Sequence, residues 1–257
     1  MTFELGRPPI IEAWIRANFQ PATETEWNWS DVANLIATYE QELCELEMLP
    51  SATPVARHLK KGQLPKEVLI KVEPRYLRAR TTDRTRIVQV GQNELIVVQG
   101  RGADSGYPGF TKLLQDFMEA LTRYRDHLTP LCVDSVELHY ADLVVIPNMF
   151  LESLELADLF DGAPSLPADP YGNMAAVSWS IGLVCPNSTD FAELAVQMQP
   201  PDEDNGRFRL DWHRYGCELA DDSPAAIAER LRIAHNYLKE CFRTVCKDPV
   251  WLQFDPQ

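Results

Sequence analysis

The stretch Arg84–Gly109 constrains the fold of this chain more than any other. Short apolar runs rich in β-branched residues at 86–90 and 94–99 predict two strands, and the intervening Gly91-Gln92-Asn93 predicts a tight turn. After a glycine-rich loop, apolar residues recur at helical spacing over Phe110–Leu128. The stretch therefore predicts an antiparallel hairpin that a short loop joins to a long amphipathic helix.

The glycine-rich loop Gly100–Gly106 lies between a strand and a helix, where a phosphate-binding loop would lie. It lacks the Gly-Lys-Ser/Thr signature, and the strands around it are predicted to be antiparallel, which is not the setting of that motif. Glycines also simply permit a tight connection. We expect a structural joint here, with phosphate binding as the less favoured alternative.

Further strands and helices are predicted on both sides of this stretch. Ile10–Phe19 alternates as a strand does, with Trp14 and Arg16 on the face opposite Ile15. Before the hairpin, we expect a helix from about Ser30 to Leu46, a loop over 50–66, and strands at 67–72 and 76–80 that are either separate or one strand bent at Pro74. After residue 130, we expect strands at 133–146, 177–183, 194–198 and 208–214, a short helix at 150–160, and a long helix that Ser223 caps.

The two halves, 1–130 and 131–257, therefore share one order of elements: strand, helix, antiparallel meander and long helix. We expect an α+β fold, one compact unit in which both halves contribute to a curved antiparallel sheet backed by long helices. One face of this sheet would remain open to a partner or to a second copy of the chain.

Composition narrows the class of protein. The chain has 257 residues, a net charge of −14 and six cysteines without a Cys-x-x-Cys pair, so we expect reduced thiols, no metal and no cofactor. No apolar run approaches the roughly 20 residues that span a bilayer, and the N-terminus lacks the pattern of a signal peptide. We expect a cytoplasmic protein that does not enter a membrane.

Basic residues are concentrated between Arg57 and Arg86 on this acidic chain. On a strand, Tyr76 would share a face with Arg78 and Arg80, which is an arrangement that can stack bases and hold phosphates. Because the net acidity opposes nucleic-acid binding, we favour a face that pairs with acidic residues of this chain or of a protein partner. The candidate partner- or anion-binding residues are Arg75, Tyr76, Arg78, Arg80, Arg84 and Arg86.

A second candidate site lies on the strand near residue 211. Asp211, His213 and Tyr215 alternate onto one face, and a histidine beside a carboxylate can act as a general base. An exposed polar sheet face has the same pattern without any function. His139 and Asp142 suggest the same chemistry more weakly, because Asp142 is expected at the start of a buried run. Asp211, His213 and Tyr215 are the candidates for a ligand-binding or hydrolytic pocket between sheet and helix.

Several short motifs resemble a known family. They are the opening Pro8–Ala13, the run from Asp83 to Gly91, the Tyr107–Phe110 entry into a helix, and the segment from Leu138 to Pro147. The chain is similar in these motifs to a sporadically distributed family of uncharacterised bacterial proteins of about 250 residues. The resemblance implies an accessory gene and no established reaction.

The chain departs from that family at two places. The family tends to carry Arg-Tyr-x-Asn-Arg where this chain has His139 to Leu143, and Asn-Trp-Arg where it has Val98 to Gly100. An activity that depended on those residues would be absent here. We therefore expect a non-enzymatic protein-binding accessory or regulatory protein, in a bacterial defence or toxin-immunity system. A homodimer is left open, and nucleic-acid binding through 57–86 is an alternative that is not favoured.

Overall fold

The computed structural model describes most of the chain. The described residues are 9–20, 28–39, 42–43, 45–57, 67–103, 106–128, 132–147, 156–163, 177–184, 191–199, 205–219 and 221–251. The side chains of 50–57, 67–75 and a few isolated residues are outside this description.

The nine strands that the structure describes form one sheet in which every pairing is antiparallel. The order across the sheet is β2-β3-β4-β5-β1-β6-β9-β8-β7. The strands are β1 (Ile10–Phe19), β2 (Glu45–Arg57), β3 (Glu67–Arg80), β4 (Arg86–Gly91), β5 (Glu94–Gly100), β6 (Val133–Pro147), β7 (Ser178–Val184), β8 (Phe191–Gln199) and β9 (Asn205–Glu218). The expected α+β fold with an antiparallel sheet is confirmed.

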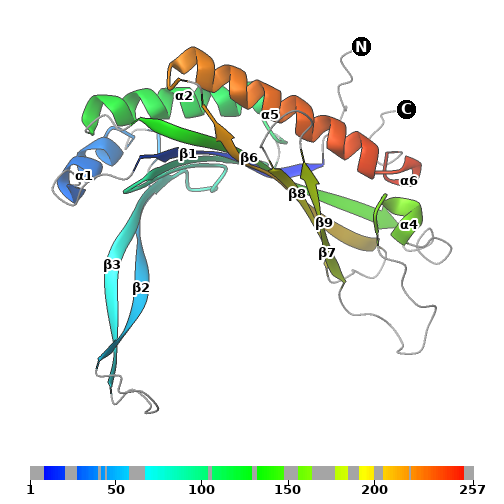
Figure 1. Ribbon diagram of the computed structural model, residues 1–257, viewed down its shortest axis with the longest axis horizontal. Coiled ribbons are helices and arrows are strands. Elements are labelled where there is room, and N and C mark those ends of the chain that lie inside the picture. Colours follow the sequence, from blue (N-terminus) through cyan, green and yellow to red (C-terminus); the bar gives the residue numbers. More distant parts are fainter. Residues whose placement is uncertain are drawn as a thin grey trace.

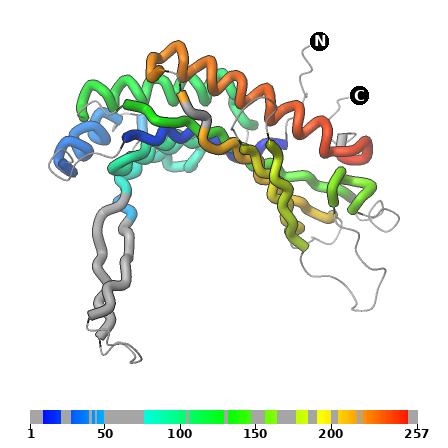
Figure 2. The backbone as a smooth tube through the Cα atoms, in the orientation of Figure 1, coloured from blue at the N-terminus to red at the C-terminus, as the bar shows by residue number. Residues whose placement is uncertain are grey.

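The described helices pack on the convex side of this curved sheet (Figure 1). They are α1 (Trp29–Ala37), α2 (Phe110–His127), α4 (Leu156–Leu159), α5 (Pro224–Val245) and α6 (Asp248–Trp251). Figure 2 shows β1 and β6 side by side under the two long helices, in agreement with their pairing. No helix of the described chain lies on the concave face.

The alternation of β1 decides which side chains meet the helices. Ala13, Ile15 and Ala17 are fully buried, and they pack with the apolar stripes of α2 and α5 in one continuous core. The largest buried side chains of this core include Trp212, Tyr124 and Phe117. Because successive strand residues point to opposite faces, Trp14 and Arg16 must lie on the concave face.

Two expectations about the first half are wrong. The loop expected over 50–66 is a strand as far as Arg57, while 58–66 lie outside the described residues. β2 tolerates Pro50 and Pro54 because it is an edge strand, where a missing N–H disrupts little pairing. Pro50 of β2 lies opposite Pro74 of β3, where the register of the two strands shifts. The strands expected at 67–72 and 76–80 are one continuous strand, β3.

Helix α1 ends at Ala37, not near Leu46 as the apolar pattern predicts. Thr38 ends it with a backbone N–H that donates to the carbonyls of Leu35 and Ile36. Tyr39 and Leu43 remain buried although they are no longer helical. At the other end, the helix begins at Trp29, close to the expected start at Ser30. Its N-cap is Asn28, whose side chain accepts a hydrogen bond of 2.9 Å from the Ser30 amide.

Later elements follow the pattern more closely. Ser223 caps α5 as expected, with Oγ 3.2 Å from the Ala226 amide. The short helix expected at 150–160 is described only as α4, because 148–155 lie outside the described residues. Within the part of the chain that the structure describes, no helix combines the length and hydropathy needed to cross a bilayer.

Candidate functional site

A row of ring-bearing side chains crosses the concave face. It begins at Trp14 on β1 and continues through His139 on β6 and His213 on β9, which are cross-strand neighbours in register. Tyr215 lies further along β9 and is paired with Phe191 on β8, which is in turn paired with Val184 on β7. We call these residues the aromatic stripe: the rings of Trp14, His139, His213, Tyr215 and Phe191, with the apolar Val184 at the end of the row.

The rings of the stripe contact one another. Trp14 stacks on His139 with centroids 4.8 Å apart, and it meets His213 edge-on at the same distance. His213 and Tyr215 have centroids 3.6 Å apart, and Tyr215 stacks on Phe191 at 5.9 Å. Phe191 is 43% exposed and Val184 is 76% exposed. The stripe therefore runs from a partly covered centre to an exposed apolar end.

Each histidine of the stripe is held by a carboxylate on the neighbouring strand. His213 Nε2 lies 2.9 Å from Glu137 Oε2, and His139 Nε2 lies 3.3 Å from Asp211 Oδ1. Asp211 also accepts three hydrogen bonds from Arg209. The histidine and carboxylate that alternate along β9, His213 and Asp211, are therefore not partners of each other.

These pairings shift the pKa values of the groups. Burial alone would raise the pKa of Asp211, but hydrogen bonds from His139 and Arg209 outweigh it and lower that pKa to about 2. In the same way, His213 and Asn18 hold the pKa of Glu137 below its usual value despite burial. Burial lowers the pKa of His213, although Glu137 opposes that shift. Both carboxylates are ionised at neutral pH.

Ion pairs continue beside the stripe toward β3. Arg16 lies 3.3 Å from Glu94 and 3.5 Å from Glu137, with its guanidinium 5.2 Å from the Trp14 ring centroid. The Tyr76 hydroxyl donates to Glu94 on the same face. Both signs of charge therefore alternate across the concave surface.

The predicted basic patch is divided between the two faces of the sheet. Arg80 pairs with Glu45 at 2.8 Å and Arg78 donates to the Gln89 side chain, both on the concave face. Arg84 lies exposed in the turn before β4 with φ of 60°. The side chain of Arg75 lies outside the described residues.

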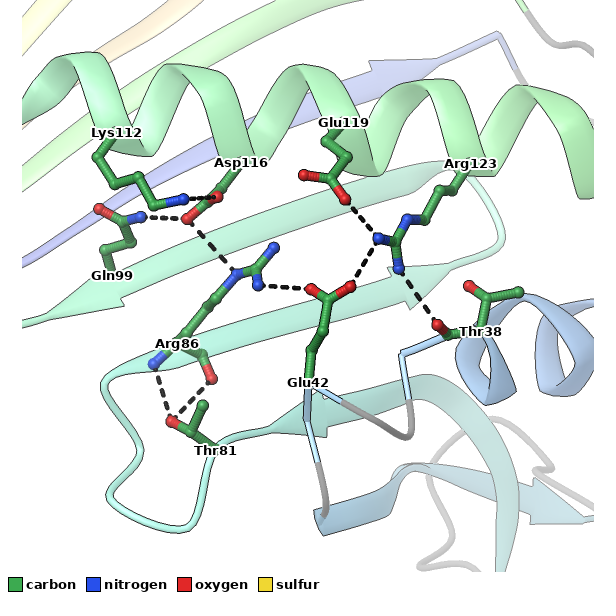
Figure 3. A network of polar contacts seen from close by, with 9 residues as sticks. All are labelled: Thr38, Glu42, Thr81, Arg86, Gln99, Lys112, Asp116, Glu119 and Arg123. Carbon is green, nitrogen blue, oxygen red and sulfur yellow. Dashed lines mark hydrogen bonds and ion pairs between the residues drawn. The ribbon is translucent and has the colours of Figure 1, made fainter.

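Arg86 lies on the helix side, within a polar network under α2 (Figure 3). It contacts Glu42 at 2.8 Å and Asp116 at 3.4 Å. Asp116 is 1% exposed and also accepts from Gln99 and from Lys112. This network joins α2 to β4 and β5 and is separate from the concave face.

A cavity lies between the sheet and the helices, where the second candidate pocket is expected. Its lining includes Tyr140, Asp142 and His235. Asp211, His213 and Tyr215 do not line it, because they point to the opposite face of the sheet.

Sequence reasoning did not select Trp14, Glu137, Phe191 or Val184 as site residues. The alternation of β1 places Trp14 on a polar face, and that signal was available. Neighbouring positions on β6 and β8 depend on strand order and register, which local patterns do not specify. No group of three or more potential metal ligands occurs among the described side chains.

No protein-family model matches the chain, and no curated protein matches it.

Proposed function

We propose that this protein is a non-enzymatic accessory or regulatory protein that binds a protein partner on its concave sheet face. The aromatic stripe is the observation that carries the proposal. Interface centres are enriched in aromatic residues and in arginine, and a few such residues supply most of the binding energy. Trp14 with Arg16 would form the central anchor, and Phe191 with Val184 would contribute exposed apolar area.

The charge of the face favours a protein over a nucleic acid. Its arginines, such as Arg16, Arg78 and Arg80, each contact a carboxylate or an amide of this chain. A nucleic-acid surface would instead present unneutralised basic groups along the phosphate path. A mixed surface of both signs suits the polar rim of a protein partner.

The histidines of the stripe suit a binding role better than a catalytic one. His213 and His139 are each held by a carboxylate, and within the described chain no serine or cysteine side chain hydrogen-bonds to either imidazole. A general base must reach the group that it deprotonates. A ligand-binding or hydrolytic role for Asp211 and His213 is the weaker alternative.

The proposal includes a two-part architecture, with halves 1–130 and 131–257. β1 and β6, the first strands of the two halves, pair at the centre of the sheet, and the last strand of each meander, β5 or β9, lies beside its own first strand. A long helix, α2 or α5, completes each half. This arrangement supports a pseudo-twofold scaffold whose centre coincides with Trp14 and His139.

A role in a bacterial defence or toxin-immunity system belongs to the same proposal. Its support is the resemblance to a sporadically distributed bacterial family, which implies an accessory gene. The partner would then be a protein encoded beside this one.

Affinity copurification with the proteins of neighbouring genes tests the proposal. The tagged wild-type chain is compared with Phe191→Ala and with Ile233→Ala, whose parent side chains are 43% and 44% exposed on opposite sides of the sheet. We expect one stoichiometric partner that survives nuclease treatment, is lost with Phe191→Ala and is kept with Ile233→Ala. A partner that both variants retain, or material that nuclease removes, would overturn it.

Light scattering of the purified chain tests whether a second copy of the chain, instead of another protein, binds the concave face. A monomer at micromolar concentration leaves the concave face to another protein. A dimer that Phe191→Ala dissociates would assign the face to self-association and would contradict a hetero-partner there.

A further inference from the structure

A cavity of about 670 Å³ lies on the convex side of the sheet, away from the aromatic stripe. Tyr140 and Asp142 of β6 and Trp212 of β9 lie on its sheet side, and His235 and Phe242 of α5 lie on its helix side. The first turn of α2 also borders it. Its volume is within the range of about 300–1,000 Å³ that is typical of small-molecule sites.

Three polar groups of the lining have unmet hydrogen-bonding capacity among the described residues. Asp142 is 3% exposed, and its Oδ1 has no hydrogen-bond partner. The indole N–H of Trp212 lies near enough to this carboxyl to lower its pKa, but it has no hydrogen bond of ordinary geometry either. The buried hydroxyl of Tyr107 is in the same condition. Burying such groups without partners is costly, so they are expected to meet a ligand that supplies hydrogen bonds. Burial raises the pKa of Asp142 to about 7, and its ionised form calls for a donor such as an N–H group.

An aromatic wall lies beside these groups. Phe110 stacks on His235 with centroids 4.2 Å apart, and the Tyr140 hydroxyl lies 2.8 Å from His235 Nδ1. Burial, together with nearby Lys239, lowers the pKa of His235 to about 4, so this imidazole is neutral at physiological pH. The wall is therefore flat and uncharged, which favours a planar ring.

The rim of the cavity is electropositive. Helix α2 begins at this rim. Its N-cap residue is Gly109, with φ of 94°, which has no side chain to cap the helix, so the N–H groups of the first turn of α2 lack intrahelical partners. Arg232, Lys239 and Arg243 of α5 line the same cavity on a chain whose net charge is −14. Arg232 and Arg243 contact glutamates in exposed pairs along α5, at 3.5 and 3.3 Å, and exposed pairs of this kind neutralise charge weakly.

We propose that this cavity binds a planar heteroaromatic molecule with N–H donors at one end and an anionic group at the other, the chemistry of a nucleoside monophosphate. The donors meet Asp142 Oδ1, the ring packs against the aromatic wall, and the anion lies at the α2 N-terminus beside Lys239. The inference concerns a different face from the proposed protein interface and does not depend on it.

Calorimetric titration of the full chain tests the inference. The probes are AMP, GMP, CMP and UMP, their four nucleosides, and inorganic phosphate. We expect at least one monophosphate to bind with Kd below about 1 mM, its nucleoside to bind about tenfold more weakly, and phosphate alone to bind more weakly than either. If no monophosphate binds at about 1 mM, the inference is overturned.

Variants at the two ends of the cavity separate its parts. Asp142→Asn, which exchanges the acceptor for an amide of the same shape, is expected to weaken the monophosphate and its nucleoside equally, by about tenfold. Thr111→Glu places a carboxylate at the rim and is expected to weaken only the monophosphate. Since acidic residues suit the first turn of a helix, Thr111→Glu should fold even if Asp142→Asn does not.

Two matched controls complete the experiment. Arg230→Gln removes a charge from α5 outside the cavity lining, and Asp211→Asn removes a carboxylate from the concave face. Both are expected to leave the monophosphate affinity unchanged. Equal affinity of the wild type and Thr111→Glu, or a loss of affinity in the controls, would place the ligand elsewhere.

Discussion

The indole of Trp14 lies flat against the imidazole of His139, with planes 10° apart and centroids 4.8 Å apart, on the face of the sheet that no described helix covers. Trp212 lies two strands away in the sheet but points to the opposite face, where it is 1% exposed. The two tryptophans therefore differ in what they stabilise. Trp212 belongs to the core, and Trp14 belongs to the surface proposed for a partner.

Replacement of each tryptophan by alanine should reveal this difference. We expect Trp212→Ala to lower the free energy of unfolding by about 3–5 kcal/mol, because it empties a buried site. Trp14→Ala loses the stacking on His139 and the contact with Arg16, and we expect a cost of only about 1–2 kcal/mol. Urea denaturation measures both values, and equal costs would contradict the assignment of Trp14 to a binding surface.

Asp116 should be the residue of the α2 network on which stability depends most. It is almost fully buried and is contacted by Gln99, Lys112 and Arg86, so Asp116→Ala would leave their donors without an acceptor. We expect a loss of about 3–5 kcal/mol in urea denaturation, as when one partner of a buried ion pair is removed.

Lys112→Ala is the matched control, because it removes the half-exposed partner of the same carboxylate. Its expected cost is below about 1 kcal/mol. If the two variants lost equal stability, Asp116 would depend mainly on Lys112, and the contacts with Arg86 and Gln99 would contribute little.

The elements of this fold were largely predictable because their patterns are local. The alternation of Ile10–Phe19, the hairpin before Gly100 and the heptad-like α5 each encode an amphipathic element within a few residues. The prolines at 50 and 54 led to the wrong prediction of a loop, since a proline disfavours a central strand but is compatible with an edge strand. Only the strand order, which local sequence does not state, identifies β2 as an edge.

The candidate site was predictable only in part, for the same physical reason. Asp211, His213 and Tyr215 share a face by alternation, whereas Trp14 and Glu137 join them through pairings of strands far apart in sequence. The basic run before Arg86 indicated a patch, but its charges lie on two faces of the sheet. Arg80 is paired across the turn with Ile87, so these two side chains share the concave face. Arg86, the residue next to Ile87, therefore points to the opposite face, under α2.

Asp211 should make the fold sensitive to acid. Its pKa is about 2 in the folded chain and about 3.9 in an unfolded one, so its contribution is present above about pH 4 and is lost as the pH falls toward 2. We expect Asp211→Asn to lower the free energy of unfolding by about 2 kcal/mol at neutral pH and by almost nothing near pH 2. Asp134→Asn, an exposed carboxylate on β6, serves as the control in urea titrations at both pH values, and a penalty for Asp211→Asn that persists near pH 2 would contradict the assignment.

Asp142 should make the free energy of unfolding depend on pH in the opposite direction to Asp211. Burial raises its pKa to about 7, so the folded chain binds more protons than the unfolded one between about pH 4 and 7, and stability falls as the pH rises through that range. His235, with a pKa of about 4, opposes this slope below about pH 6.5, so the wild-type profile alone does not isolate Asp142.

The difference in the free energy of unfolding between Asp142→Asn and the wild type isolates the contribution of Asp142. Relative to the wild type, we expect the variant to gain about 1.4 kcal/mol per pH unit between about pH 4 and 7. Chemical denaturation at a series of pH values measures this difference. A difference that stays constant with pH would mean that Asp142 is already ionised in the folded chain.

Site-specific photo-crosslinking tests the central claim, that a protein partner occupies the concave face. A photoreactive amino acid replaces Phe191 in one sample and Ile233 in another, at nearly equal exposure on opposite sides of the sheet. The account predicts one protein adduct of defined mass from position 191, absent when Trp14→Ala is added, and no such adduct from position 233. An adduct from position 233 alone, or one from position 191 that persists with Trp14→Ala, would contradict it.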